Sequence, residues 1–79
     1  MQKLVKIYTT PTCTYCKMAK EFFKQNKIQY EELDVVTNAK AREEMINKSG
    51  QMGVPVIFVG DDIVVGFDRS RLSELLMIK

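Results

Sequence analysis

Apolar and polar residues follow two different periods along the chain, and this pattern predicts alternating strands and helices. Some stretches are rich in β-branched and aromatic residues and alternate in polarity, as half-buried strands do. Others repeat their apolar residues at spacings of three and four, which is typical of amphipathic helices. The predicted strands are 4–8, 29–35, 53–59 and 63–65, and the predicted helices are 13–26, 38–48 and 68–78. The predicted order is therefore β-α-β-α-β-β-α.

Capping and turn residues support these boundaries. Asn38 and Asp68 are suitable N-caps, and Gly50 is a suitable residue for ending the second helix. Pro55 lies at the entry of the third strand, where the missing N–H is tolerated, and 60–62 is a hairpin turn. The apolar helix positions that we expect to face inward are Cys16, Ala19, Phe22, Phe23, Met45, Ile46, Leu72, Leu75, Leu76 and Ile78.

The element order indicates the fold class. The first β-α-β unit predicts a parallel strand pair joined by a right-handed crossover, and the final hairpin adds antiparallel pairing. We therefore predict an α/β protein with a thioredoxin-like fold, in which helices flank a mixed four-stranded sheet. The length of 79 residues and the absence of linkers or repeats predict one domain over residues 1–79.

Composition narrows the function classes. Hydrophobic residues make up 46% and charged residues 28% of the chain, which favours a globular protein over a disordered one. The net charge of +2 comes from interleaved charges without a basic run, so we expect no nucleic-acid partner. No apolar tract is long enough for a membrane span, and the N-terminal residues 1–7 contain no leader-like apolar region. We expect a monomeric cytoplasmic protein.

The chain contains two cysteines, Cys13 and Cys16, in a C-x-x-C arrangement. A structural zinc site normally needs four Cys or His ligands, and the chain has no histidine, so we expect no metal site. A structural disulfide across three positions would constrain little of the unfolded chain, and would be unusual in a reducing compartment. Two inert buried cysteines stay open as an alternative, but C-x-x-C beside a β-α-β pattern favours a redox-active disulfide.

The position of the pair assigns a role to each cysteine. Cys13 lies where the first helix begins, and the positive end of the helix dipole favours its thiolate. Cys16 belongs to the apolar stripe and should be shielded. Cys13 is therefore the expected attacking thiolate, and Cys16 the thiol that resolves the mixed disulfide. Lys17 would add positive charge or point into water, and Tyr15 is either a docking contact beside Cys13 or an ordinary half-exposed tyrosine.

Three separated motifs carry a resemblance to a known family. They are T-x-P-T-C-T-Y-C around the cysteines, G-V-P at 53–55 and G-F-D at 66–68. With these motifs in this order the whole chain resembles the glutaredoxins, and in particular the short glutaredoxin-like proteins of the NrdH and YruB types. The resemblance implies thiol-disulfide oxidoreductase activity, electron transport and a role in cell redox homeostasis.

The resemblance also implies a substrate site. Val54 and Pro55 would form a cis peptide bond, with the Val54 backbone pairing with the cysteinyl part of glutathione; the alternative from residue type alone is a trans proline that starts a strand. Gln51 stands where a polar glutathione contact often lies. Asp68 would hold the glutathione ammonium or act only as an N-cap, and Phe67 would dock a protein partner or fill the core.

Departures from the family pattern leave the electron donor open. Many glutaredoxins have a lysine just before the first cysteine, where this chain has Thr12, and Phe67 replaces a cysteine of the G-C-D-D motif. Losing a charge-assisted hydrogen bond weakens glutathione binding. Gly66 and Phe67 instead resemble the S-G-F segment of NrdH-type redoxins, which take electrons from thioredoxin reductase.

We therefore predict a small enzyme that reduces protein disulfides, with glutathione mixed disulfides as a further substrate, and that serves as electron donor for a reductive enzyme. Its reductant would be glutathione or a thioredoxin-reductase-like flavoprotein, its acceptor a disulfide-bearing protein, and it would hold no tightly bound cofactor. The alternative is a glutathione-dependent iron–sulfur cluster carrier. It is disfavoured because cluster ligation needs four thiolates and the chain offers one or two.

Overall fold

A computed structural model describes residues 4–78, so the leader prediction for residues 1–7 lies partly outside the described residues. Four strands and three helices follow one another in the predicted order. They are β1 (Val5–Thr9), α1 (Thr14–Gln25), β2 (Glu31–Asp34), α2 (Ala39–Ser49), β3 (Val56–Val59), β4 (Asp62–Val65) and α3 (Arg69–Leu76).

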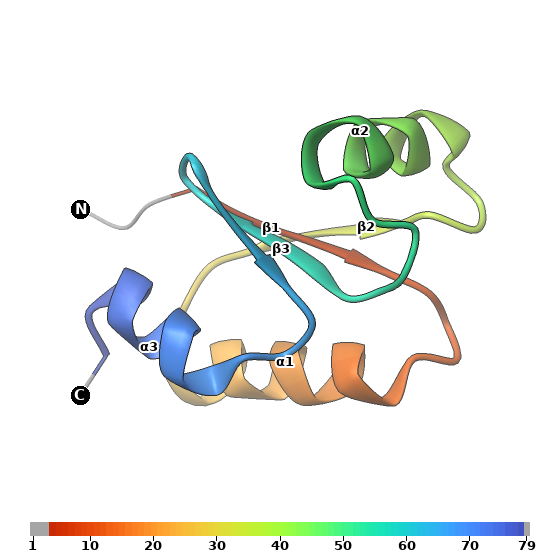
Figure 1. Cartoon of the computed structure of the whole chain (residues 1–79). Coiled ribbons are helices and arrows are strands. Elements are labelled where there is room, and N and C mark those ends of the chain that lie inside the picture. The colour runs from red at the N-terminus through yellow and green to blue at the C-terminus, as the bar shows by residue number, and fades with distance from the viewer. Residues whose placement is uncertain (1–3, 79) are drawn as a thin grey trace.

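The strands form one mixed sheet in the order β2-β1-β3-β4. β1 pairs with β2 in parallel, whereas β1–β3 and β3–β4 are antiparallel, as the predicted crossover and hairpin require. In Figure 1, α1 and α3 cover one face of the sheet and α2 covers the other. These features confirm the predicted thioredoxin-like fold class.

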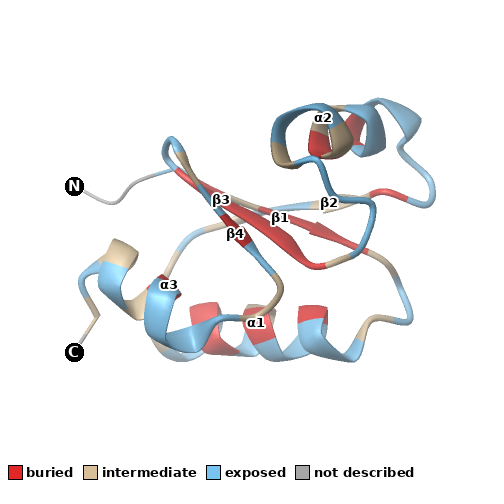
Figure 2. Cartoon of the chain, in the orientation of Figure 1, coloured by how far each residue is buried: buried red, intermediate tan, exposed pale blue. Residues whose placement is uncertain are grey.

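Each face of the sheet has its own apolar cluster, and the buried residues lie where the helices meet the strands (Figure 2). The cluster on the α1 and α3 face contains Val5, Ile7, Ala19, Phe22, Phe23, Ile57, Val59, Val64 and Leu72. The cluster under α2 contains Tyr8, Val35, Ala41, Met45, Val56 and Phe58. The inward stripe predicted for the first helix is confirmed, because its four residues are the buried ones of α1.

The predicted caps are confirmed. The side chain of Asn38 accepts a hydrogen bond from the Ala41 N–H at 3.0 Å, and that of Asp68 accepts one from the Arg71 N–H at 3.1 Å. Gly50 ends α2 with a left-handed φ of 70°, a conformation that glycine adopts without steric cost.

Some boundaries differ from the prediction. β3 begins at Val56 rather than at residue 53, because a proline has no N–H to donate to the ladder and pairing starts after it. Asp62 is not a turn residue, since it pairs with Val59 in β4. Ile78 lies beyond the end of α3, yet it is half-buried against the core because its N–H bonds back to the Ser73 carbonyl. No helix within residues 4–78 has the length and apolar content needed to cross a membrane.

Candidate active site

Cys13 is the N-cap of α1. Its backbone is extended (φ −85°, ψ 111°), and its Sγ accepts a hydrogen bond from the Cys16 N–H at 3.1 Å. The first N–H groups of a helix have no intrahelical partner and carry the positive end of its dipole. No acidic residue lies in the first turn of α1 to oppose this field. A thiolate at Cys13 would therefore have a backbone donor already directed at it.

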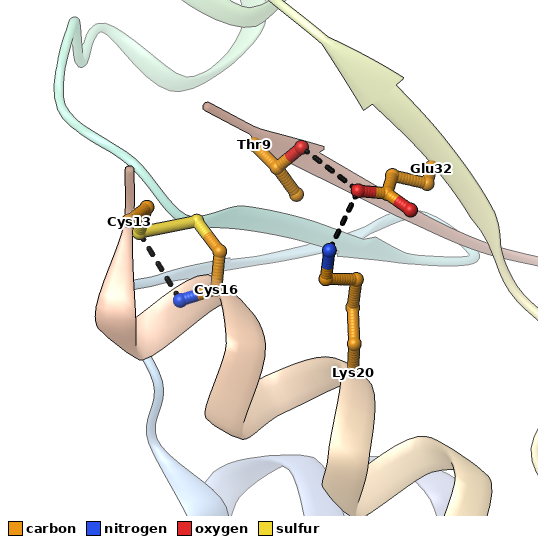
Figure 3. A network of polar contacts seen from close by, with 5 residues as sticks. All are labelled: Thr9, Cys13, Cys16, Lys20 and Glu32. Atoms are coloured by element: carbon orange, nitrogen blue, oxygen red, sulfur yellow. Dashed lines mark hydrogen bonds and ion pairs between the residues drawn. A yellow bond between two sulfur atoms is a disulfide. The ribbon is translucent and has the colours of Figure 1, made fainter. Parts of the chain in front are cut away.

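The two sulfurs form a disulfide, and they differ in exposure. The Cα atoms of Cys13 and Cys16 are 5.2 Å apart, within the usual range for a disulfide. Figure 3 shows the two cysteines joined by the disulfide at the start of α1. Cys16 is fully buried at 0% exposure, whereas Cys13 is half-buried. An incoming thiol or disulfide therefore has access to Cys13 and not to Cys16. This is the asymmetry expected from the helix pattern.

A groove of about 520 Å³ is lined by Tyr15, which lies between the two cysteines in the sequence. Its lining residues come from the first turn of α1, from the loop before β3 and from the β4–α3 connection. They are Tyr15, Val54, Pro55, Val65, Gly66, Phe67, Asp68, Arg69 and Ser70. Five of the residues that the sequence analysis singled out therefore meet at one groove: Tyr15, Val54, Pro55, Phe67 and Asp68.

The loop before β3 forms one wall of this groove. The Val54–Pro55 peptide bond is cis, as the family resemblance implied, and Pro55 is buried. The Pro55 carbonyl accepts a hydrogen bond from the Gly66 N–H at 2.8 Å, which ties this loop to the β4–α3 connection. Gly66 has a φ of 82°, so a side chain there would strain the backbone.

Phe67 and Asp68 each have a structural role in the fold: Phe67 packs against the core, and Asp68 caps a helix. Phe67 is half-buried, and its ring packs edge-on against Phe22 with 5.9 Å between centroids, while it still lines the groove. The exposed Asp68 caps α3 with one carboxylate oxygen. Tyr15, in contrast, is 61% exposed beside Cys13, so most of its ring is open to a partner.

Two predicted site residues lie outside this groove. Lys17 is exposed and lines a second groove of about 420 Å³ along α1, separated from the first by Phe67 and Arg69, which line both. Gln51 is exposed near the end of α2, and its N–H bonds to the Ser49 Oγ at 3.1 Å. Gln51 does not line either groove.

Sequence reasoning missed Arg69 as a groove residue. Its guanidinium lies 5.5 Å from the centre of the Phe22 ring, a cation–π arrangement that holds it between the two grooves. Arg69 is the basic residue among those lining the first groove. The available signal was the family resemblance, in which residues 66–69 correspond to the G-C-D-D motif and Arg69 replaces its second Asp.

Potential metal ligands do not cluster in the described part of the chain. Among residues 4–78, no three His, Cys, Asp or Glu side chains lie close enough together to hold a metal ion.

Comparisons with known proteins match most of this chain. The family model described as "Glutaredoxin" matches residues 5–64. A relative from Clostridium pasteurianum, named as an uncharacterized glutaredoxin-like 8.6 kDa protein in a rubredoxin operon, is 42% identical over 73 residues, covering 92% of this chain and 97% of its own. Glutaredoxin 3 of Escherichia coli K12 is 42% identical over 64 residues, covering 81% of this chain and 77% of its own.

Solved structures show the same likeness. The crystal structure of the thioredoxin-like protein BC3987 is similar with a TM-score of 0.87 and 35% identity, covering 91% of this chain and 99% of that one. The glutaredoxin-like NrdH-redoxin of Escherichia coli, whose structure is described as the basis of a thioredoxin-like activity profile, has a TM-score of 0.79 and 25% identity, covering 90% of this chain and 92% of its own.

Proposed function

The chain belongs to the glutaredoxin family, and we propose that it is a dithiol oxidoreductase that reduces protein disulfides and serves as electron donor for a reductive enzyme. The observation that carries this proposal is the contrast within the disulfide. Cys13 is accessible and has a backbone N–H on its sulfur, whereas Cys16 is fully buried behind it. In such a pair the accessible cysteine attacks the target disulfide, and the buried cysteine resolves the mixed disulfide.

The reaction follows from this contrast. The Cys13 thiolate attacks one sulfur of a target disulfide, forms a mixed disulfide and releases the other target sulfur as a thiolate, which takes a proton from water. Cys16 then loses its proton and attacks Cys13 Sγ. The second target sulfur leaves as a thiol, and two electrons have passed from the dithiol to the target. The exposed Tyr15 and the groove walls would contact the target chain next to its cysteine.

Two substitutions test this assignment. Cys13→Ser should abolish reduction of any disulfide, whereas Cys16→Ser should retain the attack and accumulate a mixed disulfide that mass spectrometry detects as an adduct. Insulin, whose reduction is followed by turbidity, is a suitable protein substrate. Full activity in Cys13→Ser would overturn the proposal.

A further experiment distinguishes the two donor classes. Glutathione has two carboxylates and an ammonium, and the first groove offers it Arg69 and Asp68, with Thr12 in place of a lysine before Cys13. The oxidised protein is incubated with NADPH and either glutathione plus glutathione reductase or thioredoxin reductase. NADPH consumption in the second mixture alone would identify thioredoxin reductase as the class of electron donor. Consumption in the first alone would identify glutathione as the reductant.

A further inference from the structure

Three polar side chains form a network beside the buried end of the disulfide. Glu32 Oε2 accepts a hydrogen bond from Thr9 Oγ1 at 3.3 Å and forms an ion pair with Lys20 Nζ at 2.8 Å. These residues come from β2, β1 and α1, and Figure 3 shows the Lys20 ammonium between the helix and the strands, on the side of α1 that carries Cys16. Neither of the grooves described above includes any of the three.

Backbone geometry places this network on the Cys16 side of the sheet. Thr9 alternates with Val5 and Ile7, which pack against α1, and Glu32 lies opposite Ile7 in the parallel register. Lys20 follows Cys16 by four positions, which puts the two side chains on one helix face about 5–6 Å apart at Cβ. Thr9 is 2% exposed, and the side chains of Lys20 and Glu32 are 24% and 43% exposed, so the network runs from the buried strand β1 out to water at Glu32.

The chemistry of resolution makes charge at this position important. Cys16 must become a thiolate to attack, and burial disfavours a thiolate. A nearby ammonium favours the thiolate and a nearby carboxylate opposes it. Asp34 lies opposite Thr9 in β2, and its Oδ1 accepts a hydrogen bond from the Val36 N–H at 2.8 Å. The charged Lys17 and Arg69 are exposed at the grooves.

We propose that the Lys20–Glu32 ion pair, anchored by Thr9, controls how readily Cys16 loses its proton and therefore how fast the mixed disulfide is resolved. Lys20 stabilises the Cys16 thiolate, and Glu32 moderates this effect by drawing the ammonium toward β2. In this step the Cys16 proton passes to water, a Cys13–Cys16 bond forms, and the bond between Cys13 and the target sulfur breaks. The target sulfur leaves with the electron pair and is protonated by solvent.

The role in resolution rests on the proposed function, but the charge effect is measured without any biological partner. In a Cys13→Ser background Cys16 is the remaining thiol, and its ionisation is followed by thiolate absorbance. Lys20→Met should raise the apparent pKa of Cys16 by roughly 1 unit, the usual size of a close charge effect, and Glu32→Gln should lower it. Lys20→Arg should stay near the parent value.

Matched controls separate position from net charge. Glu31→Gln removes the same charge from the neighbouring residue of β2, whose side chain lines a different cleft with Lys6 and Ala41 on the α2 face. Lys24→Met removes a lysine from the exposed surface one turn after Lys20. Both controls should leave the ionisation of Cys16 unchanged.

The rate of resolution gives a second readout in the two-cysteine protein. The aromatic disulfide DTNB releases one coloured thiolate when Cys13 attacks and a second when Cys16 resolves. A rise of one unit in the pKa of Cys16 lowers the fraction of thiolate about tenfold below that pKa, but it makes the remaining thiolate about threefold more nucleophilic. Lys20→Met should therefore slow the release of the second coloured thiolate roughly threefold.

Opposite shifts for Lys20→Met and Glu32→Gln in Cys16 ionisation would support the proposal. Shifts in the same direction, or shifts no larger than those of Glu31→Gln and Lys24→Met, would overturn it and leave the network a purely structural role. This titration needs no reductase and no target protein. Its outcome is therefore independent of whether the proposed function is right, and the two failures can be told apart.

Discussion

Tyr8 and Thr9 are consecutive residues of β1, both are buried, and each bonds to a glutamate on a different element. The Tyr8 hydroxyl donates to Glu44 Oε1 on α2, and the Thr9 hydroxyl donates to Glu32 Oε2 on β2. Because successive strand residues point to opposite faces, the first contact lies under α2 and the second on the α1 side, near the disulfide. One strand thus supplies a polar contact to each layer of the fold.

The two contacts differ in what surrounds them. Tyr8 belongs to an apolar cluster with Met45 and Phe58, and the Lys48 ammonium lies 5.8 Å from the centre of the Phe58 ring. The Tyr8–Glu44 hydrogen bond is therefore one of several contacts that hold α2 on the sheet. Thr9 instead joins an ion pair that lies one helical turn from Cys16. The comparison suggests that the α2 contact serves stability, whereas the α1 contact serves the thiol chemistry.

The largest effect should come from the α2 core. Met45 is 0% exposed beneath α2, and Met45→Ala should lower the free energy of unfolding by about 2–5 kcal/mol, the usual cost of truncating a buried methionine. The rate of DTNB reduction by the folded protein should not change. Met52→Ala, at a residue that is 73% exposed, serves as the control and should shift unfolding by less than about 0.5 kcal/mol. A large fall in thiol reactivity for Met45→Ala would show that the two faces are not separate.

Tyr8→Phe should have a smaller, pH-dependent effect. This substitution removes the hydroxyl that donates a hydrogen bond to Glu44. It should lower the free energy of unfolding by about 1 kcal/mol near neutral pH, as measured by urea unfolding. Burial, followed by the bond to Glu44, raises the pKa of Tyr8 above its ordinary value of 10.0. The hydrogen bond from Tyr8 lowers the pKa of Glu44 below its ordinary value of 4.5.

These shifts fix the sign of the pH dependence. A lowered carboxyl pKa gives stability that is present above about pH 4.5 and lost as the pH falls, and a raised tyrosine pKa gives stability that is present below about pH 10 and lost as the pH rises. The stability difference between the parent and Tyr8→Phe should therefore be greatest between these limits. A difference that is constant from pH 3 to pH 11 would contradict the Tyr8–Glu44 contact.

The smallest effect tests whether the two contacts are independent. Thr9→Val keeps the side-chain shape, removes the bond to Glu32 and should cost about 1 kcal/mol or less. Because Tyr8 and Thr9 share no side-chain partner, the double variant Tyr8→Phe/Thr9→Val should equal the sum of the single variants within about 0.5 kcal/mol. A larger coupling energy in this double-mutant cycle would show that the two faces communicate through β1.

Local patterns predicted what depends on near neighbours. The α1 stripe, the Asn38 and Asp68 caps and the Gly50 terminus each depend on residues within about one helical turn, and all were confirmed. One error came where pairing between strands decides a boundary. Asp62 belongs to β4 because Val59 lies opposite it, and no local signal contains that register.

The candidate site divides in the same way. The exposure of Cys13 and the burial of Cys16 follow from where a helix begins and which of its faces is apolar, so the sequence by itself determined which cysteine is accessible. Only the tertiary structure placed Arg69 at the groove, left Gln51 outside it, and brought Thr9 and Lys20 to Glu32. These last contacts join residues that are 23 and 12 positions apart, and they form because the parallel β1–β2 register and the packing of α1 bring three elements to one place.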